Sequence, residues 1–262
     1  MAAAQQPESF LQWHEAALDF AIACNQLSKA KYDKAPDDIV RAAIFVLHHD
    51  AVITHRAVRA LVEAGWSSSG AALVRTLFDI SISALAILNS SDSNLAAFKY
   101  FYSNYRETAR DQSYEPEFRR EMRAVIRTRI QSLPTKDRAA ALEFLKLKDR
   151  PYWFADEWHS PSEVIVKFGL PGMDWMYKQF SAAAHGGFFG LRLFRDRGDD
   201  FDVNPRLPFG SHAELVLAAS TRLLFDLCRL RIESEPLPLA RKCYDLTRAF
   251  NAFGRTAQQA DA

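Results

Sequence analysis

The sequence predicts an all-α protein, built as a single-domain bundle of about eight to ten helices. Apolar residues recur with the helical period in nearly every segment, and almost no segment alternates as a strand would. The 10 glycines and 11 prolines are few and cluster at a small number of breaks. With 262 residues, 48% of them hydrophobic, the chain can bury a large core. We expect one helical domain over residues 8–257, with disordered termini at 1–7 and 258–262.

Start signals support several helix boundaries. The sequences PDD at 36–38, PT at 134–135 and SPSE at 160–163 place a capping residue or an early proline where a first turn needs one. The longest irregular pieces are 149–160 and 195–209. In chain order, we expect helices at about 8–29, 37–64, 67–90, 93–113, 116–132, 135–148, 161–168, 172–190, 210–233 and 237–256.

Charge and cysteine usage indicate a cytoplasmic protein. The 33 Lys and Arg against 32 Asp and Glu give a net charge of +1, so nucleic acid or an anionic membrane would need a local basic patch. Cys24, Cys228 and Cys243 form no CxxC pair, and an odd count argues against a disulfide framework. The first residues lack the basic and apolar regions of a signal peptide.

The segment 70–88 is long and apolar, but we expect it to be a core helix, with no membrane partner. It carries Arg75 and Asp79 near its middle. At the bilayer centre each charge would cost about 2.5–3.5 kcal/mol on insertion scales, which so short a segment would not offset.

Arg75 and Asp79 form the first part of a candidate site. Four residues apart on a helix, they share one face, and small residues around them allow a neighbouring helix to approach closely. We expect the pair to be buried. An Arg that precedes its Asp is the weaker order within a helix, so each charge should find further partners on other helices. A structural ion pair that fixes helix register is the alternative.

The segment 172–190 supplies candidate partners. Tyr177, Ser181 and His185 follow one another at intervals of four, with Asp174 three residues before the tyrosine. These polar side chains form one ridge of the helix. His185 precedes two glycines where the helix would end, and a helix C-terminus favours a protonated imidazole. The alternative is a core Tyr and His that bind the backbone. The opposite face carries Met173, Met176, Phe180 and Ala183.

A third segment, 37–64, stacks histidines on one helix face. His48 and His55 lie seven residues apart, almost two turns, with Arg41 seven residues before His48. Their separation of about 10 Å along the axis prevents both from binding one ion, so we expect no metal and no other cofactor. Satisfied core histidines are the alternative. The full stripe is Arg41, Ile44, His48, Ala51, His55, Val58 and Val62.

Two of these elements resemble a known family. The order AGWSSSGAALVRTLFD, RPYWFADEW and MYKQFSAAAHGG, over about residues 45–190, resembles an uncharacterised bacterial all-helical family of unknown function. Its members share an Arg-Thr/Ser-Leu-x-Glu/Asp element and a Tyr-x-x-x-Ser-x-x-x-His element. The resemblance implies that the two elements belong together, and it implies no activity. The matching positions are Arg75, Thr76, Leu77, Asp79, Tyr177, Ser181 and His185, with Asp79 where Glu is commoner.

Arg41 and His48 resemble a second family. The spacing is similar to the Arg-x(4–6)-His motif of the helical nucleotide-binding superfamily shared by higher eukaryotes and prokaryotes, which includes metal-independent ribonucleases. Ala42 stands where a polar residue usually follows the Arg. The resemblance implies an RNA partner, a homodimer, His48 as the base for the 2′-hydroxyl and Arg41 at the phosphate. Residues 106–150 hold twelve Lys and Arg against eight Asp and Glu, a local balance of +4. A solvated helical face is the simpler account of this balance, since acidic residues interleave throughout and aromatic residues are few.

Three functions therefore remain open. The first is a pocket for a small anionic or nucleotide-like group, in which His185, Asp79 and Tyr177 do chemistry while Arg75, Ser181 and His55 bind the ligand. The second is a ribonuclease of toxin or antiphage type that uses Arg41 and His48. The third is an interaction module without enzymatic activity. A phosphate-binding glycine loop, a GxSxG elbow and an HExxH motif are all missing from the sequence.

Overall fold

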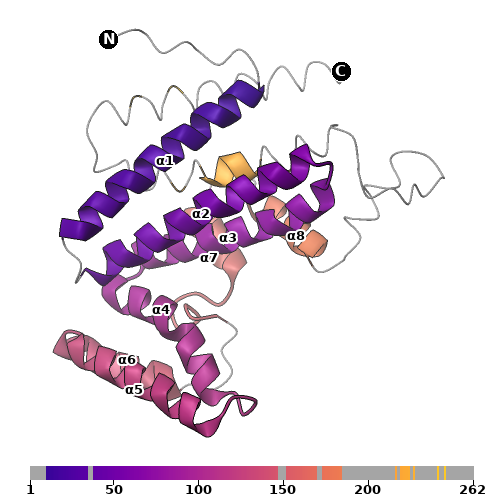
Figure 1. Cartoon of the computed structure of the whole chain (residues 1–262). Helices are drawn as coiled ribbons and strands as arrows, with labels where there is room; N and C mark the ends of the chain where they lie inside the picture. The colour runs from indigo at the N-terminus through magenta and orange to yellow at the C-terminus, as the bar shows by residue number, and fades with distance from the viewer. Residues whose placement is uncertain are drawn as a thin grey trace. The chain divides into compact units, whose positions relative to one another are not determined.

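The computed structural model describes residues 10–34, 38–146, 152–169 and 173–184, with positions 216, 219–224, 227, 241 and 245 (Figure 1). Within these residues the chain is helical and has no strand, which confirms the all-α prediction. The continuous helices are α1 (Phe10–Lys34), α2 (Ile39–Glu63), α3 (Ser67–Asn89), α4 (Ser93–Arg110), α5 (Pro116–Ser132), α6 (Thr135–Lys146), α7 (Pro161–Phe168) and α8 (Met173–Ala184).

Most expected boundaries lie close to these bounds because the caps act as the sequence suggests. The expected end of the first helix at 29 is wrong, because α1 continues to Lys34. Ser160 accepts a hydrogen bond from Glu163 N at 3.2 Å, and Pro161 opens α7. Two boundaries, 116–132 and 161–168, match at both ends. Most of the expected helices 210–233 and 237–256, and both termini, lie outside the described residues.

The chain forms two compact units. The first unit comprises the described parts of Met1–Lys31, Phe45–Ser81 and Trp175–Ala262. The second unit comprises those of Tyr32–Ile44 and Ile82–Asp174.

Close contact between α2 and α3 organises the first unit. Gly65, with φ of 84°, ends α2 in a conformation that suits glycine, and its N–H donates to Val62 O at 3.0 Å. On α3, a Cβ at Gly70 would lie 3.3 Å from Val62 Cγ2 and 3.5 Å from Val58 O. A small residue at Gly70 therefore lets the two helices approach, and it explains part of the small-residue stripe around Arg75.

Helix α3 is apolar enough to raise the question of a membrane span. Residues Ser69–Asn89 pass a test of length and composition, with a mean hydropathy of 1.8. In this structure 67% of that window is buried inside the protein, including Val74, Leu77 and Phe78 at 0% exposure. The core helix of a soluble protein passes the same test, and this burial supports the core-helix expectation.

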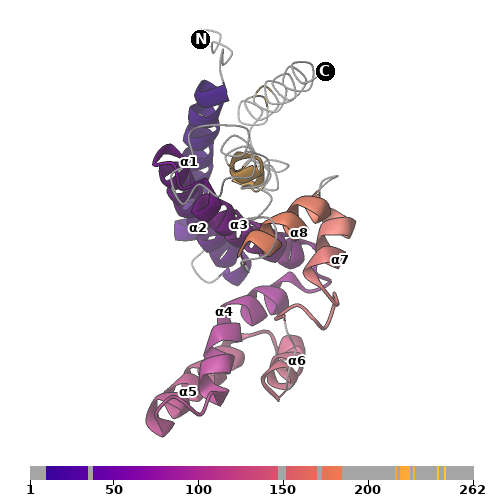
Figure 2. The same ribbon diagram turned by 90° about the vertical axis from the view of Figure 1, so that its right-hand side faces the viewer.

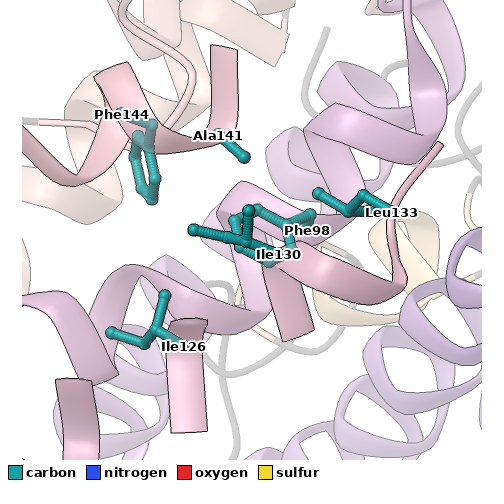
Figure 3. Packing of buried hydrophobic residues seen from close by; sticks show 6 residues of the cluster. All are labelled: Phe98, Ile126, Ile130, Leu133, Ala141 and Phe144. Carbon is teal, nitrogen blue, oxygen red and sulfur yellow. The ribbon is translucent and has the colours of Figure 1, made fainter. Parts of the chain in front are cut away.

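The core of the second unit lies between α4, α5 and α6, which pack side by side in both views (Figure 2). Apolar residues at helical spacing on α5 and α6 face Phe98 of α4 (Figure 3). Arg106 is buried at the edge of this core, where its guanidinium carbon lies 4.4 Å from the ring centroid of Phe144 and Nη1 donates to Phe144 O at 3.3 Å. The core residues are Phe98, Ile126, Ile130, Leu133, Ala141 and Phe144.

Candidate functional site

Arg75 of α3 joins the two polar elements that the sequence singled out. Its Nε donates to Ser181 Oγ at 2.9 Å, and its Nη2 donates to Tyr177 OH at 2.8 Å. Tyr177 and Ser181 lie one turn apart on α8, so a single face of that helix presents both acceptors. The structure thus brings together three of the residues expected at the site.

Aromatic packing fixes the tyrosine that Arg75 contacts. The guanidinium carbon of Arg75 lies 4.3 Å from the ring centroid of Tyr177, within cation–π distance. Phe78, one turn beyond Arg75, meets the Tyr177 ring edge to face at 5.9 Å. Phe180, which is 2% exposed, packs against Phe78 at 6.1 Å between ring centroids. These rings restrict the Tyr177 hydroxyl to the neighbourhood of Arg75.

Asp79 completes the cluster, but not as a buried residue. Its Oδ1 forms an ion pair with Nη1 of Arg75, whose side chain is 16% exposed. The Asp79 side chain is 54% exposed, so the expectation that both charges are buried is wrong for the carboxylate. The physical reason is that a carboxylate at the edge of the helix face keeps its hydration while it still reaches the guanidinium, which avoids most of the desolvation cost.

The arrangement leaves donors available on Arg75. A guanidinium has five N–H donors, and Ser181, Tyr177 and Asp79 engage one nitrogen of Arg75 each. About two N–H groups therefore remain on the terminal nitrogens for another acceptor. A held guanidinium of this kind is suited to carboxylate or phosphate oxygens. We call Arg75, Asp79, Tyr177 and Ser181 the arginine site.

The expected split of helix α8 into a polar and an apolar face is observed in part, because Met176 of the expected apolar face is half-buried. Tyr177 and Ser181 are half-buried beside Arg75, while Met173 and Phe180 are 5% and 2% exposed. His185, the last residue of the expected polar ridge, lies outside the described residues.

His55 belongs to a different group of buried polar residues. Its Nδ1 lies 2.6 Å from Ser220 Oγ in a hydrogen bond, and its ring centroid lies 6.3 Å from that of His14. His14 Nδ1 in turn is hydrogen-bonded to Thr221 Oγ1. All four side chains are at most 1% exposed. We call these four residues the histidine cluster. The contacts seen for His55 in the described residues are within this cluster, so its expected place at the edge of the arginine site is not observed.

Burial makes both imidazoles weak bases. It lowers the pKa of His14 to about 3, with help from His55 and the nearby Arg59 cation, and it lowers the pKa of His55 to about 4. Both rings are therefore neutral near pH 7. Arg59 forms ion pairs with Glu15 at 2.5 Å and Glu63 at 2.7 Å, and these hydrogen bonds raise its pKa.

The sequence offered no signal for most of the histidine cluster. His14 belongs to none of the motifs found in the sequence, and Ser220 and Thr221 lie more than 160 residues from His55 in the chain. What the sequence did show was that His48, Ala51 and His55 share one face of α2, and the structure buries all three.

Arg41 and His48 differ in their exposure to solvent. The Arg41 side chain is 48% exposed and pairs with Asp38 at 2.9 Å, whereas His48 is 2% exposed. A ribonuclease that used His48 as a base would need the imidazole to reach a 2′-hydroxyl. In the structure the His48 imidazole is buried and lacks this access.

Two arginines of the basic stretch on α5 contact other groups of the protein. Arg120 lies 3.7 Å from Glu117, and Arg123 Nη2 donates to Ala109 O at 3.1 Å. These contacts fit a solvated helical face that also fixes α5 against α4. Among the described residues, no group of three or more His, Cys, Asp or Glu side chains is close enough to hold a metal ion.

Comparison with known proteins identifies a family. A family model described as "Family of unknown function (DUF5677)" matches residues 41–202. This span is more than half of the chain, and it includes every residue of the arginine site. Neither the curated proteins nor the solved structures contain a match to the chain.

Proposed function

Because the chain belongs to DUF5677, a family of unknown function, we propose its function from its own geometry: the arginine site binds a small anionic or nucleotide-like group. The observation that carries this proposal is the state of Arg75. Its guanidinium is largely buried, is fixed by Ser181 and Tyr177, and retains donors for a further acceptor.

Preorganisation is the physical reason that such an arginine suits an anion. Ordering a free Arg side chain costs up to about 2 kcal/mol of rotamer entropy, and here the protein contacts have already imposed that order. A ligand oxygen then gains charge-assisted hydrogen bonds, each contributing about 1.5–3 kcal/mol. Low exposure strengthens the attraction further because water screens it less.

Asp79 has a distinct role in this proposal. It orients Nη1 of Arg75 while the site is empty, and its exposure allows the carboxylate to move into water when an anion arrives. An incoming phosphate or carboxylate therefore competes with Asp79 for the same guanidinium nitrogen. This competition favours ligands whose charge or bidentate geometry exceeds that of one carboxylate.

His185 would add proton transfer to binding. It follows Ser181 by four residues in the sequence, a spacing that on a continuing helix would put it on the same face as Tyr177 and Ser181. We propose that it donates a proton to the bound group or accepts one from it. In the absence of such a step the site would be a binding module.

Calorimetric titration with inorganic phosphate and with adenosine monophosphate tests the proposal. We expect saturable binding that Arg75→Gln abolishes and that Ser181→Ala weakens, because Arg75 then loses a hydrogen bond that orders its guanidinium before the ligand binds. Arg56→Gln is the matched control, because Arg56 is an exposed residue of α2. Binding that Arg75→Gln leaves unchanged would reject the site. Loss of folding in Arg75→Gln without any ligand effect in Ser181→Ala would favour the interaction module.

A further inference from the structure

The second unit contains a cavity that is separate from the arginine site. Its volume is about 620 Å³, and it lies between the first turn of α2, one face of α4 and the end of α5. Ligand sites in proteins usually enclose about 300–1,000 Å³, so the space would accommodate a small organic molecule. All of its lining residues in the described part of the chain belong to the second unit.

One stripe of α4 lines the cavity with aromatic rings. Asn94, Phe98, Tyr102 and Tyr105 follow one another at helical intervals and line the space together. The rings of Phe98 and Tyr102 are 4.7 Å apart between centroids, and those of Tyr102 and Tyr105 are 5.6 Å apart. Phe98 is fully buried in the core, whereas Tyr105 is 40% exposed. The rings therefore form a continuous series from the floor of the cavity to its opening.

Arg129 gives the cavity its charge. Among the lining residues that the structure describes, it is the one with a formal charge. The start of α2 and the end of α5 also line the space, and their helix dipoles have opposite signs, so they largely offset each other. Burial raises the pKa of the Tyr102 phenol, while the neighbouring Arg129 acts in the opposite direction. The phenol therefore stays neutral near pH 7, and the guanidinium decides the sign of the cavity.

We propose that this cavity is a binding site for a small molecule that combines a planar aromatic ring with one anionic group. The ring would stack against the aromatic side chains of α4, and the anion would meet Arg129 at the end of α5. Asn94 and Ser132 supply an amide and a hydroxyl for further hydrogen bonds. Such a combination of apolar walls and few placed polar groups is typical of small-molecule sites.

The geometry favours a small ligand over a nucleic-acid strand. A strand needs several cations along its backbone. Arg129 is the one cation among the described lining residues, and two other arginines of α5 have their own contacts: Arg120 lies near Glu117, and Arg123 binds Ala109 O. One guanidinium at the cavity matches one anionic group. This site is independent of the arginine site, so either can fail without the other.

Fluorescence titration with 1-anilinonaphthalene-8-sulfonate, a planar aromatic monoanion, tests the proposal on the full chain. The neutral N-phenyl-1-naphthylamine is the matched probe without charge. We expect one saturable site for the anionic probe. Arg129→Gln should weaken the anionic probe by about tenfold, the value of a charge-assisted hydrogen bond, and leave the neutral probe within about twofold. Arg127→Gln, two residues away on α5 and outside the lining, should change neither.

Blocking variants decide where the probes bind. Ala42→Phe places a ring into the space and should abolish both probes, provided that the near-ultraviolet circular dichroism of the protein is retained. If Ala42→Phe does not fold, Tyr105→Ala at the opening serves instead and should weaken both probes by about fivefold or more through lost stacking. Competition by indole-3-acetate or by adenosine monophosphate then distinguishes an aromatic carboxylate from a nucleotide. Equal loss in Arg127→Gln and Arg129→Gln, or unchanged binding in the blocking variant, would overturn the proposal.

Discussion

Arg75 Nε lies 2.9 Å from Ser181 Oγ, although 106 residues separate them in the sequence. This hydrogen bond connects α3 with α8 and gives Arg75 an orientation that its own helix does not impose. Since Tyr177 OH accepts from Nη2 of the same guanidinium, one side of Arg75 is fully engaged with α8.

Arg75→Gln should destabilise the protein only moderately. Its loss leaves the Tyr177 and Ser181 hydroxyls without their partner, at about 0.5–1.5 kcal/mol for each hydrogen bond. Loss of the ion pair with Asp79 adds little to the destabilisation, because the Asp79 carboxylate is already exposed to water. Urea denaturation should therefore show a loss of about 1–3 kcal/mol. A loss above about 4 kcal/mol would indicate that Asp79 becomes a buried unpaired charge, contrary to its exposure here.

Asp79→Asn should strengthen anion binding. The substitution removes the negative charge that competes for Nη1 of Arg75 and keeps a side chain of the same size. We expect phosphate to bind several-fold more tightly, with unfolding free energy changed by less than about 1 kcal/mol because the carboxylate is exposed. Glu157→Gln is the matched control, since Glu157 is an exposed carboxylate that binds Ser90 in the second unit. Weaker phosphate binding in Asp79→Asn would show that Asp79 holds the ligand-binding geometry instead.

The histidine cluster should make stability depend on pH below neutrality. His14 and His55 have folded-state pKa values of about 3 and 4, against 6.5 in the unfolded chain. Below pH 6.5 both histidines bind protons in the unfolded state, whereas in the folded state they stay neutral until the pH approaches their lowered pKa values. Stability is therefore fully retained above pH 6.5 and falls as the pH drops toward the folded values, by at most about 1.4 kcal/mol per pH unit for each histidine.

Denaturation at a series of pH values between about 7 and 5 measures this slope, in a range where carboxylates contribute less. In the variants His14→Asn and His55→Asn, the amide oxygen replaces the Nδ1 position toward Thr221 or Ser220, and the group no longer titrates. Each should reduce the slope. His49→Asn is the control, because His49 is exposed on α2 and should leave the slope unchanged. A slope that persists in the double variant would place the titrating group elsewhere.

RNA cleavage provides a separate test of the ribonuclease alternative. His48 is buried, so we expect single-stranded RNA to remain intact in the presence of a chelator. If cleavage is observed, it should be equal in wild type and in His48→Ala that retains its circular dichroism. A rate that collapses in both Arg41→Ala and His48→Ala would restore the alternative and would require His48 to become accessible in solution.

Local signals explain how much of the fold could be predicted. Periodicity and caps such as Ser160 with Pro161 act within a few residues, so the sequence placed helix boundaries closely. The same periodicity placed Arg75 with Asp79 on α3, and Tyr177 with Ser181 on α8. The family resemblance indicated that these two pairs belong together. Neither the periodicity nor the resemblance predicted solvent exposure. The Asp79 side chain is 54% exposed, and its exposure depends on how other parts of the chain pack against α3.

The histidine cluster shows the limit of sequence reasoning more clearly. His55 looked like a site residue because it lies on a stripe with His48. Its actual partners, Ser220 and His14, come from distant segments and follow no spacing rule. The aromatic stripe of α4 also gave no signal of a binding site in the sequence, because rings at helical intervals are typical of a core. The cavity becomes visible only from the packing of α2 and α5 around these rings.

The most direct test of the arginine site is the guanidinium signal of Arg75 itself. In a ¹⁵N–¹H spectrum, the Nε–H of Arg75 should be protected from exchange because it donates to Ser181, and Arg75→Lys identifies it by its disappearance. On titration with phosphate or adenosine monophosphate, we expect a saturable shift of the Arg75 signal and no shift of the signal from the exposed Arg56. An Arg75 signal that stays in place at ligand concentrations that shift surface arginines would contradict the claim that this site binds anions.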